Sequence, residues 1–225
     1  MTMTPEQLRA YGYRMDRQDR DYIQKLQEII PVVNGWVLDV GCGEGSIAAE
    51  LTTNKNIVGL DIDGARVKKA KSKLKKMDFI VADVCHMPFK AACLEIVVAI
   101  QIIEHVPSDK GFLQEINRIV TNEGFISIST PNRYRVSNLP RLLYNRVLGR
   151  PSYPYDLGGS LGQYAGIHLR EYTLSELRYI MNPEFTVILS FEYTLGYGNY
   201  CLPMSRPRFL CYMLFALGKK VVSEN

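Results

Sequence analysis

A short apolar run that ends in three alternating glycines is the feature that most constrains the fold of this chain. The run comprises residues 37–40, and it continues without a break into Gly41, Gly43 and Gly45. Glycines at this spacing allow a tight turn, and they let a ligand approach the backbone N–H groups at the start of the following helix. Because a helix N-terminus carries partial positive charge, the pattern predicts a nucleotide-like ligand bound where a strand meets a helix.

Strand-type and helix-type segments alternate after this loop. Strands are predicted at 36–40, 56–60, 79–82, 96–100 and 125–129, and helices at 45–52, 64–77 and 108–121. Apolar strands separated by helices indicate a parallel sheet, because each parallel connection requires a crossover. The predicted fold class is therefore α/β, a doubly wound, mostly parallel Rossmann-like sheet with helices on both faces.

The segments on either side of this core are less regular. Residues 1–31 carry apolar side chains at helical spacing, which predicts an N-terminal helical cap. Residues 132–169 are rich in Arg, Tyr, Pro and Gly, which predicts an insertion, or lid, after the fifth strand. A helix capped by Thr173 and a strand at 185–193 follow, whereas the tail shows no pattern typical of a further strand. The whole chain, 1–225, is interpreted as a single domain.

The charge beside the glycines indicates which ligand the loop selects. The motif is D-x-G-x-G-x-G, and its Asp39 stands at the strand end, where the pyrophosphate of a dinucleotide would lie. A carboxylate next to a diphosphate is unfavourable by about 1 to 4 kcal/mol at effective dielectric constants of about 80 to 20. The same carboxylate favours a ligand that carries an ammonium and a sulfonium group. S-adenosylmethionine has both groups and no phosphate, so the motif indicates this cofactor.

Two further acids stand at the ends of the next two strands. Asp61 closes the second strand, 16 residues after Gly45, close to the spacing expected of an acid that binds ribose hydroxyls. Asp83 closes the third strand. Each acid alone could cap a helix or be solvated, but three carboxylates at the C-terminal ends of three strands line the crevice where ligands bind in open α/β sheets.

These motifs, together with residues 100–107 and 124–131, resemble the class I S-adenosylmethionine-dependent methyltransferase family. The resemblance is greatest to the type 11, ubiquinone-biosynthesis O-methyltransferase-like branch. It covers residues of about 35–131 closely and the rest of the chain loosely. It implies a Rossmann-like fold, an enzyme that uses S-adenosylmethionine, and a set of cofactor-binding residues at the matching positions.

The first implied group of cofactor-binding residues is the glycine loop. Gly41 and Gly43 would pass beneath the cofactor, within a loop that also contains Cys42 and Gly45. Asp39 would reach the methionine end of the cofactor through water.

The second implied group follows the next three strands. Asp61 would bind both ribose hydroxyls, and Ile62 would pack on the adenine. Asp83 would accept a hydrogen bond from the adenine amino group, beside the N–H of Val84. Gln101 would lie near the methionine moiety.

Methyl transfer from a sulfonium is an in-line displacement, so alignment can supply most of the rate. A base is needed only if the acceptor must lose a proton. Glu104 and His105 follow the fourth strand, and in related enzymes this pair lies near the acceptor, so His105 is a candidate general base or the pair part of a metal site. The alternative is a turn that caps the next helix. His168, at the end of the insertion, is a further candidate, and no metal site is assigned.

Several features bear on the acceptor. Residues 101–104 lack the N/D-P-P-Y motif of enzymes that methylate nucleic-acid bases. This absence argues against a nucleic-acid substrate. Residues 138–150 form a basic amphipathic pattern, with Asn138 as the expected helix cap, and residues 206–220 repeat the theme. These segments favour a small-molecule or lipid-like acceptor, and they are compatible with peripheral membrane contact. Ordinary core packing of either segment is the alternative.

Charge and cysteine content bear on which other classes of protein this chain could belong to. The net charge of +4 is mild, and the five cysteines include no C-x-x-C pair, which argues against a disulfide framework and a zinc site. The N-terminus lacks the apolar core of a signal peptide, so a cytoplasmic protein, peripheral to a membrane at most, is expected. Two rival functions stay open: a tRNA or protein methyltransferase, suggested by the lysines of 68–76, and a cofactor-binding regulatory domain without turnover.

Overall fold

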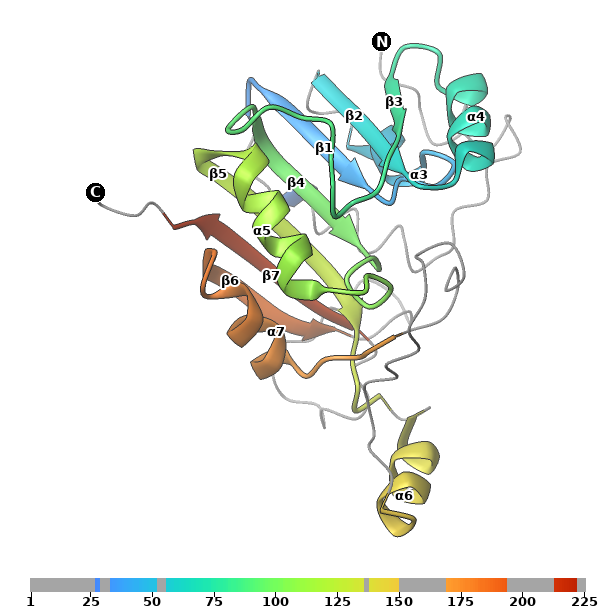
Figure 1. The fold of residues 1–225 in the computed structure, drawn as a ribbon, viewed down its shortest axis with the longest axis vertical. Helices are drawn as coiled ribbons and strands as arrows, with labels where there is room; N and C mark the ends of the chain where they lie inside the picture. Colours follow the sequence, from blue (N-terminus) through green and yellow to red (C-terminus); the bar gives the residue numbers. More distant parts are fainter. Residues whose placement is uncertain are drawn as a thin grey trace.

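A computed structural model gives the structure of the chain and describes residues 27–28, 33–51, 56–135, 138–149, 169–193 and 213–221. Its centre is a seven-stranded sheet with the strand order β3-β2-β1-β4-β5-β7-β6 (Figure 1). The strands are β1 (Trp36–Val40), β2 (Asn56–Asp61), β3 (Asp78–Val81), β4 (Leu94–Ile100), β5 (Val120–Pro131), β6 (Phe185–Tyr193) and β7 (Met213–Lys220).

The first five strands form a parallel sheet, as predicted. β1 pairs with β2 and β4, β2 pairs with β3, and β4 pairs with β5, all in parallel. Their carboxyl ends therefore meet at one edge, which places Asp39, Asp61 and the loop after β4 side by side. The order reverses at β1, where the glycine loop follows, so the loop lies at the switch point of a doubly wound sheet.

The tail contains a strand that no pattern in the sequence indicated. β7 lies between β5 and β6 and is antiparallel to both. Residues 213–217 are buried on both faces: Leu214 and Ala216 pack in one core cluster, and Phe215 in the other, where it stacks on Phe191 at 4.8 Å. A strand buried on both faces loses the alternation of apolar and polar residues that marks a half-exposed strand. The predicted amphipathic character of the tail thus fails for residues 213–220.

The described helices are α3 (Ser46–Glu50), α4 (Gly64–Lys73), α5 (Asp109–Ile119), α6 (Leu139–Val147) and α7 (Leu174–Met181). Side chains cap three of them. Asp63 accepts from two N–H groups of α4, and Ser108 accepts from the N–H of Gly111 in α5. Thr173 and Glu176 form the predicted capping box of α7.

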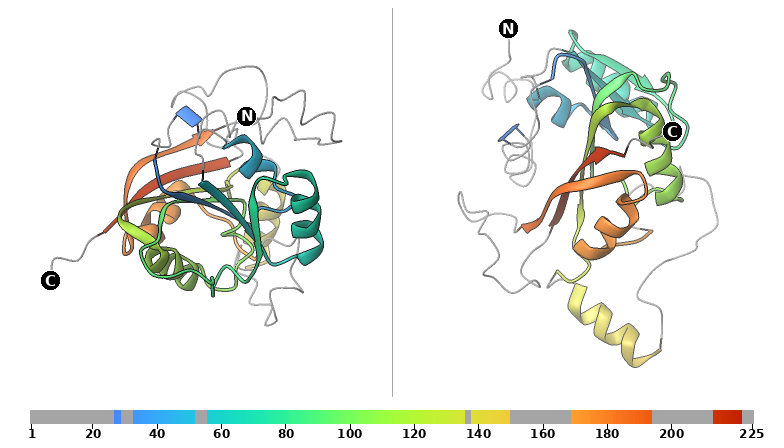
Figure 2. Two further views of the ribbon diagram at one scale, coloured as in Figure 1. Left: turned by 90° about the horizontal axis from the view of Figure 1, so that it is seen from above. Right: turned by 90° about the vertical axis from the view of Figure 1, so that its left-hand side faces the viewer.

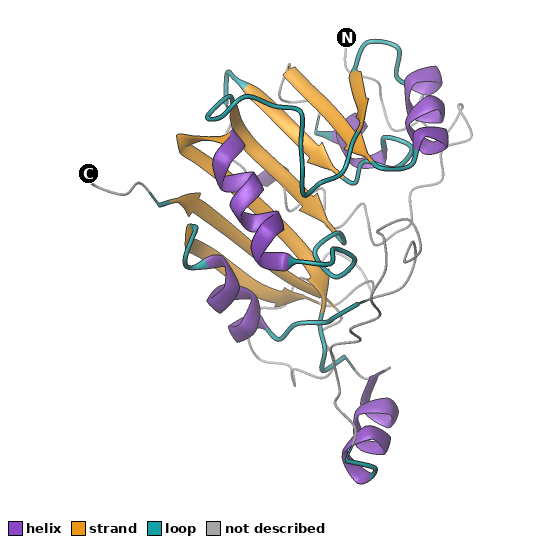
Figure 3. Cartoon of the chain, viewed as in Figure 1, coloured by secondary structure: helices purple, strands orange, loops and turns teal. Residues whose placement is uncertain are grey.

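Helices cover both faces of the sheet, as predicted (Figures 1 and 3). α5 and α7 lie on one face, where Phe112, Ile116 and Leu177 pack against Leu38 and other buried strand residues. On the opposite face α3 packs against β1 and β2 through Ile47 and other apolar side chains. α6 stands apart from both layers in two perpendicular views (Figures 1 and 2).

Two predicted regions fall wholly or partly beyond the described residues. The N-terminal helical cap of 1–31 lies outside them except for residues 27–28, and the insertion of 132–169 is described at 132–135, 138–149 and 169. No helix among the described residues has the length and apolar character that a membrane crossing requires.

Candidate functional site

The glycine loop after β1 has the tight backbone that its sequence predicts. Gly41, Gly43 and Gly45 have φ angles of 72°, 52° and 87°, in the left-handed region that strongly favours glycine. The N–H groups of Gly41 and Cys42 donate to the carbonyl of Leu60 at 2.7 and 2.9 Å, which fastens the loop to the end of β2. The loop is therefore held by the neighbouring strand.

The three glycines differ in what surrounds them. A Cβ on Gly41 would lie 2.2 Å from Cδ1 of Ile102, and one on Gly45 would lie 2.7 Å from Cδ1 of Leu74. A Cβ on Gly43 would meet nothing within 4 Å. A larger residue at Gly41 or Gly45 would thus clash with neighbouring side chains, whereas Gly43 borders open space that a ligand can enter.

Asp61 shapes the loop from the end of β2. Its Oδ2 accepts from the N–H of Gly43 at 2.8 Å, and its Oδ1 accepts from the N–H of Asp63 at 2.8 Å. Each carboxylate oxygen has a second lone pair, so the group can still accept from ribose hydroxyls. The next residue, Ile62, exposes about half of its surface, 48%, as an apolar side chain at the rim.

Asp39 lies deeper than the other acids. It is 1% exposed, and its Oδ2 accepts from the N–H of Ala48 at 3.0 Å. Burial, and to a lesser degree the charge of Asp61, raise the pKa of Asp39 to about 7, although the Ala48 hydrogen bond opposes the shift. A cation bound nearby would favour the carboxylate, so the residue suits a positively charged ligand group.

Asp83 and Val84 follow β3. Asp83 Oδ1 accepts from the N–H of Cys85 at 2.8 Å, and about a third of the Asp83 side chain is exposed. The Val84 side chain is buried in the core. His86, which follows two residues later, is exposed, with Nδ1 3.8 Å from Asp83 Oδ2.

Two other predicted residues have unusual surroundings. Gln101, directly after β4, has a φ of 52°, a left-handed conformation that is unfavourable by about 1 to 2 kcal/mol for a residue other than glycine. Its N–H donates to the carbonyl of Ser129 at 2.8 Å, which holds that conformation. The Cys42 side chain lies in a core cluster with Phe79, and burial raises the pKa of its thiol. Cys42 can therefore offer only backbone atoms to a ligand.

The candidate catalytic pair is divided between interior and surface. Glu104 is fully buried, and it accepts from Thr130 Oγ1 at 2.9 Å. Its carbonyl accepts from the N–H of Leu169 at 2.8 Å. His105 is half-buried, so it is the more accessible of the two. The third candidate, His168, lies outside the described residues.

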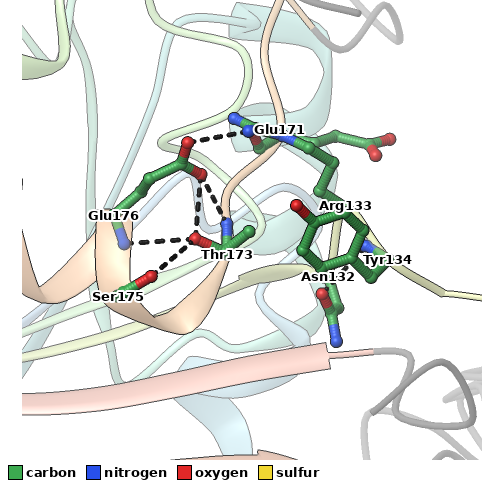
Figure 4. A network of polar contacts seen from close by, with 7 residues as sticks. All are labelled: Asn132, Arg133, Tyr134, Glu171, Thr173, Ser175 and Glu176. Carbon is green, nitrogen blue, oxygen red and sulfur yellow. Dashed lines mark hydrogen bonds and ion pairs between the residues drawn. The ribbon is translucent and has the colours of Figure 1, made fainter. Parts of the chain in front are cut away.

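Sequence reasoning missed a polar network at the two ends of the insertion. Glu171 is 1% exposed, binds Arg135 Nη2 at 2.7 Å, and accepts from the amide of Asn138. Arg133, two residues after the end of β5, donates to the carbonyl of Glu171 and to the Glu176 carboxylate at the start of α7 (Figure 4). Asn138 was expected to cap α6, but its side chain makes no cap hydrogen bond and turns to Glu171 instead.

The same segment also contacts the loop that carries His105. Arg170 forms an ion pair with Asp109 at 3.2 Å and donates to the carbonyl of Pro107 at 2.6 Å. The Tyr172 hydroxyl donates to Asp109 at 3.2 Å. The two described ends of the insertion thus lie beside the carboxyl edge of the sheet. A single acid, Glu171, in a short irregular segment gave no signal for this network, because its partners lie 33 to 38 residues away in sequence.

The described residues fit a cationic nucleoside. They offer open space beside Gly43, carboxylates at three strand ends and an exposed apolar side chain at Ile62. Among them, no group of three or more His, Cys, Asp or Glu side chains could hold a metal ion.

Comparisons with known proteins agree with this geometry. A family model described as a methyltransferase domain matches residues 38–128. A probable S-adenosylmethionine-dependent methyltransferase of Mycobacterium tuberculosis is 31% identical over 103 residues, which are 45% of this chain and 37% of that protein. The sterol 24-C-methyltransferase of Schizosaccharomyces pombe is 35% identical over 100 residues, 41% of this chain and 26% of that protein. The matches thus span well under half the length of these relatives.

Solved structures share the fold over nearly the whole chain. The partner of the Trm112 methyltransferase activator in a complex from Haloferax volcanii has a TM-score of 0.69 at 16% identity, covering 97% of this chain and 95% of that one. A protein of Methanosarcina mazei described as an S-adenosylmethionine-dependent methyltransferase has a TM-score of 0.64 at 14% identity, covering 99% and 100%. At these identities the likeness shows the fold alone.

Proposed function

Because residues 38–128 form a class I S-adenosylmethionine-dependent methyltransferase domain, we propose that this protein transfers a methyl group from that cofactor to a small-molecule or lipid-like acceptor. The observation that carries the proposal is the combination of an open Gly43 with Asp39 and Asp61, which gives a loop that admits a nucleoside and repels phosphate.

The cofactor would be held by the residues at the strand ends. Gly43 leaves room for close approach, Asp61 would accept from the ribose hydroxyls, and Asp39 would balance the charge at the methionine end. Ile62 would cover the adenine, whose amino group would donate to Asp83. When bound, S-adenosylmethionine supplies an electrophilic methyl group on a sulfonium.

The residues after β4 would serve the acceptor. His105 would take a proton from an acceptor hydroxyl or amine as the methyl group is transferred. Glu104, buried and bonded to Thr130, would act on the loop as a positioning residue, because its carbonyl also binds Leu169. His168 is proposed as a further acceptor-site group.

Two observations favour a lipid-like acceptor over a macromolecule. Sterol methyltransferases are among the relatives, and the described ends of the insertion lie beside the carboxyl edge of the sheet, where the proposed acceptor would bind. The lysines of α4, which suggested RNA, are partly engaged: Lys69 and Lys73 bind Glu44 at 3.1 and 2.5 Å.

Titration with S-adenosylhomocysteine, followed by assays of labelled methyl transfer, tests the proposal. We expect S-adenosylhomocysteine to bind without competition from NAD or ATP. We also expect the labelled methyl group to be transferred to sterols, quinones or phenols rather than to tRNA or protein. Transfer to tRNA that weakens steeply with salt would replace the proposed acceptor class with RNA. Cofactor binding with no transfer to any acceptor would instead favour a regulatory domain.

A further inference from the structure

Helix α6 presents an apolar face to solvent. Leu143, Tyr144, Val147 and Leu148 expose 63%, 60%, 83% and 46% of their surfaces. Their spacing along the helix places them on one side. The helix stands away from the sheet in perpendicular views (Figures 1 and 2), and the exposed fractions of these residues show that they face solvent. Large apolar side chains gathered on one outward face mark an interaction surface.

The sequence around α6 carries charge of one sign only. Residues 136–155 contain three arginines and neither Asp nor Glu, although the whole chain has nearly balanced charge, with 27 basic and 23 acidic residues. Arg146 is exposed on α6 itself. A short helix with an apolar face, an exposed arginine and a basic surrounding sequence fits the interface of an anionic lipid bilayer, where apolar side chains enter the acyl boundary and guanidinium groups meet headgroups.

The position of α6 links this face to the crevice. The helix follows β5 after a short segment, and the carboxyl end of β5 shares its edge of the sheet with the glycine loop and the loop of His105. The start of α6 is fixed by Asn138, which binds Glu171 and the carbonyl of Arg133. A surface bound by α6 would therefore lie on the acceptor side of the domain.

We propose that α6 docks the domain on an anionic lipid bilayer, with Leu143 and Val147 in the acyl boundary and Arg146 at the headgroups, so that a lipid-like acceptor reaches the crevice from the membrane. The delivery of the acceptor rests on the proposed function, whereas the docking itself does not depend on it. A single short helix gives weak, reversible binding, which suits an enzyme that must release its product.

Sedimentation of the full chain with lipid vesicles tests the docking. Vesicles of phosphatidylcholine are compared with vesicles that also contain phosphatidylserine, at about 0.1 M and about 1 M salt, where the Debye length falls from about 10 Å to about 3 Å. We expect binding to the anionic vesicles at low salt only. The double variant Leu143→Ser and Val147→Ser should weaken this binding by about tenfold, and Arg146→Gln should weaken it by about fivefold.

The matched control is Tyr179→Ser, which removes an equally exposed aromatic residue, 80% exposed, from α7 and should leave vesicle binding unchanged. Equal binding by all variants, or equal binding to vesicles with and without phosphatidylserine, would overturn the proposal. So would a fall in solution mass of the double variant from dimer to monomer, which would show that a second copy covers α6.

Cofactor titration keeps this test separate from the proposed function. The α6 variants should bind S-adenosylhomocysteine as the unmodified chain does, which also shows that they fold. Vesicle binding without methyl transfer to any lipid would leave docking in place and contradict the lipid acceptor. If the chain did not bind vesicles but still methylated a detergent-dispersed lipid acceptor, the lipid acceptor would stand and the docking would be contradicted.

Discussion

The backbone N–H of Gly43 donates to the carboxylate of Asp61 at 2.8 Å, which ties the loop after β1 to the end of β2. The acid that would bind the ribose therefore also fixes the glycine that the cofactor must approach. Residues 18 positions apart act as one unit, so a change at either should disturb both loop and ligand.

Gly43→Ala should weaken cofactor binding far more than it weakens the fold. The new Cβ enters open space, so stability should fall only by the backbone strain of a positive φ, about 1 to 2 kcal/mol. The same Cβ fills space needed by the cofactor, so the Kd for S-adenosylhomocysteine, measured by calorimetry, should rise at least about tenfold, equivalent to 1.4 kcal/mol. Gly149→Ala is the control, because Gly149 has a φ of 62° and open space but lies after α6. Equal affinities of the two variants would contradict the assignment.

Asp61→Ala should reduce both stability and affinity. It removes the acceptor of two backbone N–H groups, and a loss of about 1 to 3 kcal/mol is expected in the free energy of unfolding. Asp63→Ala removes the cap of α4 and should lower stability by about 1 kcal/mol while sparing cofactor affinity. Urea unfolding and calorimetry of the two variants separate these effects. An unchanged Kd for Asp61→Ala would exclude its ribose role.

Asp39→Asn should stabilise the ligand-free protein at neutral pH and weaken cofactor binding. The folded pKa of Asp39 lies near 7, above its ordinary value of 3.8, so its contribution to stability is complete below pH 3.8 and is lost as pH rises to about 7. This shift corresponds to up to about 4 kcal/mol. Asparagine carries no such ionisation, and its amide oxygen can still accept from Ala48.

The pH dependence of binding should have the opposite sign. A cationic ligand favours the Asp39 carboxylate, so the Kd should fall as pH rises toward 7 and level off above it. Asp39→Asn should bind weakly at every pH. Calorimetric titrations between pH 5 and pH 8, at intervals of about one pH unit, measure both curves. A variant that kept the original pH slope would show that another group governs it.

Glu171→Gln should destabilise the fold by about 2 to 3 kcal/mol, because it leaves Arg135 without a carboxylate at a site that is 1% exposed. Glu123→Gln breaks an ion pair with Lys219 in which the Glu123 side chain is 80% exposed, and it should change stability by less than about 1 kcal/mol. Thermal unfolding compares them. Similar melting temperatures would mean that the network at the insertion does not support the fold.

His105→Ala should lower kcat by about 100-fold or more if the histidine acts as a general base, while the Kd for S-adenosylhomocysteine stays unchanged. His86→Ala, at an exposed histidine, should leave kcat as it is. Single-turnover methyl transfer with an acceptor found in the screen gives the rate. A loss below about tenfold would show that alignment alone drives the reaction.

Much of the core could be predicted because its signals are local. β1 to β5 are apolar runs bounded by glycines or helices, and the capping box of α7 is a four-residue pattern. The backbone conformation of the glycine loop could likewise be predicted, since alternating glycines favour the positive φ angles observed at Gly41, Gly43 and Gly45.

Other features could not be predicted because they depend on distant partners. The sequence of β7 shows only a run of apolar residues, and its strand character depends on pairing with β5 on one side and β6 on the other. Asn138 is a typical cap residue, yet the buried Glu171 captures its side chain. Gln101 has a left-handed backbone because the carbonyl of Ser129, on the next strand, holds its N–H.

The sequence by itself determined the Rossmann-like sheet, the glycine loop and the acids at the strand ends, because apolar runs and glycine spacing act over a few residues. Only the tertiary structure decided that Glu104 is buried while His105 reaches the surface, that Glu171 gathers the two ends of the insertion, and that α6 turns its apolar face outward. Burial depends on which segments the fold brings together, and no local pattern carries that information.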